Sequence, residues 1–367
     1  MGRIPGSCRG RGESGHGTAR AYSGTGAREL TLAQPRNAAS LLRQKLLHLG
    51  LTRQAVDAAW PAWWSEEAEA SASARVELRF SVARKLGLDP RSLLEDPSQP
   101  RFVWHDETRF KHLTAENELD KRALASFGHA LSEILIRATP SNGRDVLPPS
   151  GELRASVLTH TPYVRLVDLL SICWAIGIPV IHLRVFPRPS KRMSAMSTHV
   201  GDRHAILLGK DASFPAMPAF YIGHELGHIA LGHITPGQAV VDLDQETLST
   251  DDSEEMEADR YSLELLTGVP APIVLPGQPR YTAESLAASA LDASRSISVE
   301  PGILALIFGY NTGRWATVNK AMRRIYDQPR PVWREINRSA WQQLSHDELS
   351  PEESDFLMAV LGLSTSK

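Results

Sequence analysis

The apolar positions between residues 38 and 96 recur at the three- and four-residue spacing that is typical of amphipathic helices. Four leucines share one face of the first predicted helix: Leu41, Leu42, Leu46 and Leu47. A short second helix can be capped by Thr52, and a longer one over residues 72–86 ends at Gly87. The pattern predicts a small helical module at this end of the chain.

Helical and strand patterns alternate farther along. We expect helices over residues 115–138 and 162–176, then two short strands over 180–185 and 204–208, with a solvated loop over 188–192 between the strands. Beyond Pro270 the pattern is again helical, over residues 282–294, 301–309, 314–326 and 350–363. The predicted fold class is α+β, mostly helical, with a small sheet.

Segments rich in Pro, Gly and Ser divide this pattern. We predict a disordered tail over 1–29, a helical repressor-like module over 30–98, a connector with a long helix over 99–149, a catalytic unit over 150–275 and a C-terminal helical domain over 276–367. The tail lacks the apolar run that a secretory signal needs.

The helical module over 30–98 resembles, in outline, the DNA-binding domains of phage repressors. In such domains the second helix of the helix-turn-helix carries donors for phosphates and base edges. The corresponding residues 63–69 hold three carboxylates and no Lys or Arg, so phosphates would repel them. We expect a degenerate module that packs against the rest of the chain or binds protein, with Trp60, Trp63 and Trp64 as core or interface anchors.

Composition narrows the choice of partner and compartment. The 40 Lys and Arg nearly balance the 42 Asp and Glu, so no global field holds the chain on nucleic acid or an anionic membrane. The two cysteines, Cys8 and Cys173, exclude a disulfide framework and a Cys-rich metal site. So few cysteines suggest a reducing compartment, and we expect a cytoplasmic protein. We expect no membrane partner, because no apolar run is long enough to span a bilayer.

The strongest chemical signal is the sequence HELGH at residues 224–228. On a helix, His224 and His228 project from one face with Cβ atoms roughly 5–6 Å apart, so both imidazoles can bind one Zn²⁺ ion. Glu225 is the predicted general base, which takes a proton from water at the metal and passes it to the departing amine. The alternative is a helix whose two histidines lie at the surface or are hydrogen-bonded in the core without a metal. Residues 219–231 are otherwise markedly apolar, however, and burying His224, Glu225 and His228 without a partner would be costly.

Two candidates compete to be the third ligand. The metzincin pattern requires Gly at the position of Leu231 and His at that of Ile234, so it fails by one register. His233, which lies near or just past the helix end, is instead expected to be structural or to support a ligand. The other candidate is Glu255, near the start of a predicted helix over residues 252–266.

The neighbours of Glu255 have different predicted roles. Asp259 lies four residues farther on the same face and can accept the free N–H of a ligating histidine, which would fix the tautomer of that ring. Glu257 is predicted to face solvent, and Glu254 is the nearest rival ligand.

The sequence HELGHIALGH, followed by EMEADRYSLELLTGVP, resembles the ImmA/IrrE metallopeptidases of bacteria and phages. The resemblance covers residues 180–270, and these positions match the pattern of the family: Glu255, Ala258, Asp259, Leu265, Leu266 and Pro270. It implies a minimal zincin-like unit with a small sheet on two metal-bearing helices. It also implies site-specific cleavage of a helix-turn-helix repressor, which would switch on a stress or mobile-element response. Asp259, where Asn is frequent in the family, should still accept a hydrogen bond.

Further roles are left open by the sequence. Zincin substrates usually add to an edge strand, for which residues 205–208 are the candidate. His204, Tyr221 and Tyr261 are eligible oxyanion donors. Residues 297–324 have the spacing of helices and turn that is typical of a helix-turn-helix, so DNA is an alternative partner to a protein substrate. The basic residues there otherwise form a solvated face: Arg314, Lys320, Arg323 and Arg324.

Three functions fit these patterns. The leading prediction is a zinc metalloendopeptidase that acts on a repressor protein. The alternative is a transcriptional regulator in which the zinc unit is structural or sensory, and a third is hydrolysis of a small amide. Glu225 separates the first two, because a purely structural site has no use for a carboxylate beside the metal.

Overall fold

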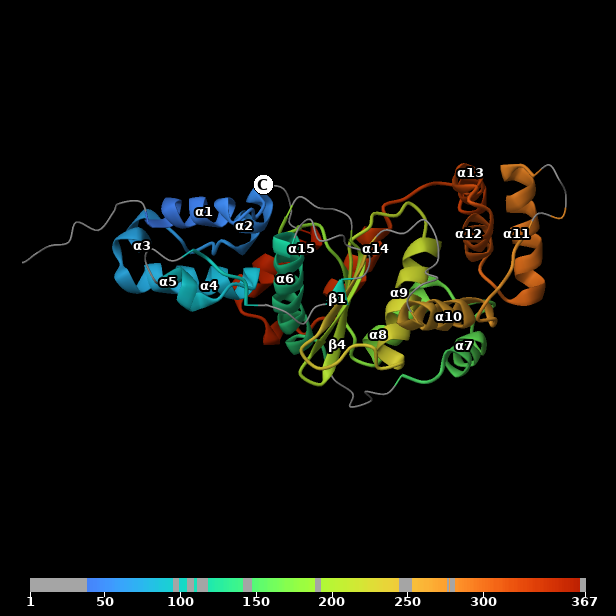
Figure 1. The fold of residues 1–367 in the computed structure, drawn as a ribbon, viewed down its shortest axis with the longest axis horizontal. Helices are drawn as coiled ribbons and strands as arrows, with labels where there is room; N and C mark the ends of the chain where they lie inside the picture. Colours follow the sequence, from blue (N-terminus) through green and yellow to red (C-terminus); the bar gives the residue numbers. More distant parts are fainter. Residues whose placement is uncertain are drawn as a thin grey trace, which may run out of the picture. The chain divides into compact units, whose positions relative to one another are not determined.

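The computed structural model describes residues 38–94, 99–103, 109–110, 118–140, 147–188, 193–243, 253–275, 277 and 281–363. Over this part of the chain the fold is mostly helical with one small mixed sheet (Figure 1), which confirms the predicted α+β class. All the described residues belong to one compact unit. No helix among the described residues is long and apolar enough to cross a membrane. The predicted division into five segments stays a prediction.

The first six helices of the described residues are α1 (Ala38–His48), α2 (Arg53–Ala59), α3 (Glu66–Ala70), α4 (Ala72–Leu86), α5 (Pro90–Leu94) and α6 (Glu118–Arg137). Thr52 caps α2 by accepting from the Ala55 N–H, and Gly87 ends α4 at φ 67°, both as predicted. The apolar face predicted for α1 included four leucines, but only two of them are buried. Leu42 and Leu46 are buried, whereas Leu41 and Leu47 are 43% and 38% exposed because they flank the buried stripe.

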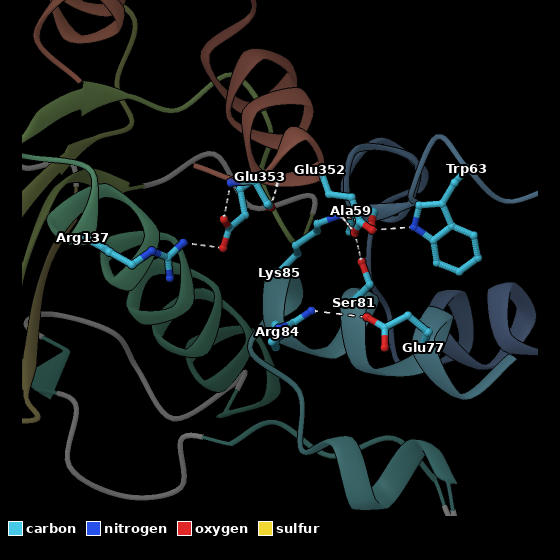
Figure 2. Close-up of polar contacts among 10 residues, drawn as sticks. Ala59, Trp63, Glu77, Ser81, Arg84, Lys85, Arg137, Glu352 and Glu353 are labelled. Carbon is cyan, nitrogen blue, oxygen red and sulfur yellow. Dashed lines mark hydrogen bonds and ion pairs between the residues drawn. The ribbon is translucent and has the colours of Figure 1, made fainter. Parts of the chain in front are cut away.

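This helical module packs against the last helix of the chain, α15 (Pro351–Leu361). Figure 2 shows the polar contacts there, where the Lys85 ammonium lies 3.2 Å from the Glu352 carboxylate and the Ser81 hydroxyl donates to it. The Trp63 indole N–H donates to the other oxygen of that carboxylate. Burial lowers the pKa of Lys85, and Glu352 opposes that shift. The module therefore follows the first of its two predicted alternatives, packing against the rest of the chain.

The sheet has the strand order β1-β5-β3-β4-β2. Its strands are β1 (Arg109–Phe110), β2 (Val180–His182), β3 (Met193–Val200), β4 (Arg203–Leu208) and β5 (Ala239–Leu243). The pairs β3–β4 and β3–β5 are antiparallel, and β2 and β1 run parallel to β4 and β5. The predicted edge strand was therefore wrong: β4 is interior, since β2 and β3 pair with it on either side.

Arg188, the first residue of the loop predicted over residues 188–192, lies outside the helices and strands as predicted, but its side chain is half-buried and not solvated. The Arg188 guanidinium donates to the Leu49 carbonyl at 2.7 Å instead of facing solvent. Residues 189–192 lie outside the described part of the chain.

Each face of the sheet is covered by helices (Figure 1). One core contains Met196 and Leu207 together with side chains of α6, whereas Ala195 and Ile206 belong to the core of α9 (Ala216–Ala230). Successive strand residues point to opposite faces, which explains why neighbours enter different cores. The second core also includes α7 (Ser150–Leu158), α8 (Leu166–Ala175), α10 (Ser253–Thr267), α11 (Ala283–Ile297), α12 (Pro301–Thr312) and α13 (Trp315–Ile325).

The free edge of β2 is closed by a side chain. Asn337, on α14 (Val332–Gln343), accepts from the His182 N–H and donates to the His182 carbonyl, both at 2.7 Å. Its amide also donates to the Leu361 carbonyl at 2.8 Å. Asn337 is fully buried and satisfies the backbone groups that a neighbouring strand would otherwise bind.

Asn337→Ala is expected to lower the free energy of unfolding by about 2–4 kcal/mol, because the change leaves buried backbone groups without partners. Urea unfolding measures this, and Asn319→Ala, at an exposed position of α13, is the control with an effect within about 0.5 kcal/mol. Equal stability of the two variants would show that the amide does not close the sheet edge.

Candidate metal centre

The HELGH sequence lies in the second half of α9, which is packed along α10. Two glycines of α9 permit this close approach. A Cβ at Gly227 would lie 2.9 Å from the Ala258 Cα, and one at Gly223 would lie 2.6 Å from the Ser262 hydroxyl oxygen. The glycine inside HELGH therefore brings the first turns of α10 within reach of the histidines.

Three side chains from the two helices converge. The Nε2 atoms of His224 and His228 are 3.0 Å apart, and Glu255 places one oxygen 3.3 Å from the first and the other 3.2 Å from the second. All three residues are buried. Among the described residues, they form the one group of at least three His, Cys, Asp or Glu side chains that could hold a metal ion.

The spacing of these atoms agrees with a tetrahedral metal site. Two ligand atoms roughly 2.0–2.1 Å from a zinc ion at tetrahedral angles lie about 3.3–3.4 Å from each other. The two Nε2 atoms are 3.0 Å apart, and each lies 3.3 or 3.2 Å from a different Glu255 oxygen, so each of these pairs is close to this value. Two imidazoles and one carboxylate also match the donor set of known catalytic zinc sites, so the residues fit the ion.

Ionisation of Glu255 favours cation binding. Burial acts to raise the pKa of its carboxyl, but hydrogen bonds to His224 and His228 outweigh burial and hold the pKa far below its ordinary value. A carboxylate at this position is the charged form that a divalent ion requires.

The Nδ1 atoms of the two histidines have separate partners. His224 Nδ1 lies 2.9 Å from the Asp259 carboxylate, the contact that the sequence predicted. His228 Nδ1 lies 3.0 Å from the Nδ1 atom of His233, so His233 contacts one of the two candidate ligands. Each Nδ1 contact directs the Nε2 atom of its ring to the convergent site.

Glu257 differs in part from its prediction. Its side chain is 55% exposed, as expected, but it also lies 3.1 Å from His233 Nε2. Sequence spacing gave no signal for this contact, because it depends on the turn at Gly232, where φ is 73°.

The other candidates lie elsewhere or have other contacts. Glu254 is half-buried and is not part of the convergent group, whereas Glu225 is fully buried beside His224 in α9.

The three candidate oxyanion donors have contacts of their own. Tyr261 donates to the Pro148 carbonyl at 3.0 Å, and burial raises its pKa. His204 stacks on His199, and burial, aided by His199, lowers its pKa to about 4. Tyr221 packs edge-on against Phe220.

No protein-family model matches the sequence, and neither a curated protein nor a solved structure matches it. We therefore argue function from the residues of the site.

Gly227→Ala is expected to lower the free energy of unfolding by about 1–3 kcal/mol and to weaken metal binding, because the new methyl group forces α9 away from α10. Thermal melting and metal titration measure the two effects. Gly151→Ala, on α7, is the control, since its Cβ would meet only a Glu264 oxygen at 3.9 Å. Its stability should change by less than about 1 kcal/mol. Tight metal binding and unchanged stability in Gly227→Ala would contradict the close-packing argument.

Proposed function

We propose that this chain is a zinc-dependent endopeptidase of the cytoplasm that cleaves a helix-turn-helix repressor and so derepresses a stress or mobile-element response. The observation that carries the proposal is the convergence of the buried side chains of His224, His228 and Glu255, whose candidate ligand atoms lie within 4.8 Å of one another. Within the described residues no fourth acid, histidine or cysteine joins them. Catalytic zinc sites have three protein ligands, whereas structural sites have four.

Each residue has a defined part in this proposal. His224, His228 and Glu255 would hold Zn²⁺, and Asp259 orients the His224 ring. Zinc, when bound, supplies a Lewis acid that acidifies water and polarises a peptide carbonyl. Glu225 accepts the proton that this water loses on attacking the carbonyl carbon, and delivers it to the departing amine nitrogen as the C–N bond breaks.

The substrate class is supported by resemblance. HELGH and the later Glu255, Ala258 and Asp259 follow the pattern of the ImmA/IrrE metallopeptidases, which implies a repressor protein as substrate. The order of helical regions also agrees, because some members of that family join the peptidase to a repressor-like helical domain.

A regulator is the second candidate, and one observation favours it. Helices α12 and α13 meet at Gly313, and α13 and its start present exposed basic side chains: Arg314, Lys320, Arg323 and Arg324. Arg324 is paired with Glu284 of α11, which reduces the charge available for phosphates.

Co-expression with the repressor encoded nearest to the gene, followed by intact-mass analysis, tests the proposal. We expect two fragments whose masses add up to the repressor plus one water, and an intact repressor when a chelator removes the metal in vitro. An intact repressor with zinc-loaded protein would contradict the proposed substrate. Binding of operator DNA without any cleavage would support the regulator.

A further inference from the structure

His228 is linked to the protein surface through a second imidazole. Helix α9 ends at Ala230, and the left-handed Gly232 turns the chain back. The His233 N–H then donates to the His228 carbonyl at 3.0 Å, and the two Nδ1 atoms are 3.0 Å apart. On its far side, His233 Nε2 lies 3.1 Å from the Glu257 carboxylate on α10. The contacts form a hydrogen-bonded series from His228 through His233 to Glu257.

The donor and acceptor roles of the atoms give this series of hydrogen bonds a direction. An ionised carboxylate can only accept, so His233 Nε2 carries the proton that it donates to Glu257. The Nδ1 atom of a neutral His233 is then an acceptor, and His228 Nδ1 must donate to it. This leaves the lone pair of His228 on Nε2, the atom that lies among the metal ligands.

The two ligating histidines are thus oriented by different means. His224 contacts the buried Asp259 directly, whereas His228 reaches a carboxylate that is 55% exposed. Glu225, Glu255 and Asp259 already place three acids in the buried site. A further buried carboxylate would add repulsion and desolvation cost, and the intervening ring keeps that charge at the surface.

We infer that His233 and Glu257 are positioning residues that fix the tautomer of His228 and thereby increase the affinity of the site for zinc. The inference rests on the proposed function, because it requires His228 to bind the metal. Glu257 acts only through His233, since it contacts that ring and not His228.

Zinc affinity of the full chain, measured by competition with a chromophoric chelator, tests this inference. We expect His233→Ala to weaken zinc binding about 10–100-fold and Glu257→Ala to weaken it by less. Glu257→Gln should keep most of the affinity, because its amide oxygen still accepts from His233. In the double variant, loss of Glu257 should add nothing to the loss of His233, because the two act in series.

Controls separate positioning from folding. His160→Ala and Glu348→Ala remove an exposed imidazole and an exposed carboxylate elsewhere, and both should bind zinc as the wild type does. Melting of the metal-free variants reports folding; Glu257 is exposed enough that its variants test the inference even if His233→Ala unfolds. Wild-type affinity in the Glu257→Ala variant, or equal and additive losses in the double variant, would overturn the inference. A wild type that binds no zinc would instead overturn the proposed function and this inference together.

Discussion

Glu225→Gln is expected to keep its zinc and to cleave the repressor about 10²–10⁴ times more slowly than the wild type. Glu225 is not one of the three convergent ligands, so the substitution leaves the metal site intact. An amide of nearly the same shape cannot take up the proton that water loses. Metal analysis of the purified variant and a time course of fragment masses measure the two properties.

The control for Glu225→Gln is Glu152→Gln, which neutralises an exposed acid on α7 and should cleave at the wild-type rate. If Glu225→Gln also cleaves at the wild-type rate, Glu225 is not the general base. If cells that carry Glu225→Gln respond like the wild type, a regulator with a structural or sensory zinc site becomes the better account.

Glu255→Ala is expected to weaken zinc binding by more than the roughly 10–100-fold that follows from loss of a residue that only contacts a ligand. Its carboxylate contacts both imidazoles and is the only acid among the three convergent ligands of the described chain. Dialysis against a weak chelator, followed by zinc analysis per chain, measures the loss. Cleavage should disappear in parallel, because the remaining residues cannot activate water alone.

Glu254→Ala provides a matched control for Glu255→Ala, because Glu254 is the adjacent acid on α10 and the nearest rival from sequence alone. It should retain one zinc ion per chain. If Glu254→Ala loses the metal and Glu255→Ala keeps it, the third ligand has been assigned to the wrong residue.

The candidate metal site was predictable because each half of it repeats one spacing within a single helix. Two histidines four residues apart share a helix face, and Glu255 and Asp259 repeat that spacing on α10. The structure brings these four residues together. The contact of His233 with His228 was less predictable, because it depends on where α9 ends and on the turn at Gly232.

The sheet was predictable only in part. β4 carries a continuous apolar run over residues 205–208, but β3 does not, because its residues 193–198, although buried on both faces, include small and polar side chains. β5 and α14 were also not predicted. Strand order depends on segments far apart in the chain, so no local pattern indicates that β2, whose free edge Asn337 closes, takes the edge position predicted for β4.

Zinc anomalous diffraction from crystals of the zinc-loaded chain tests the central claim most directly. We predict one strong peak per chain, about 2.0–2.2 Å from His224 Nε2, His228 Nε2 and a Glu255 oxygen. A peak bound by other residues, or a Glu255 side chain turned away from both imidazoles with no acid in its place, would contradict the account.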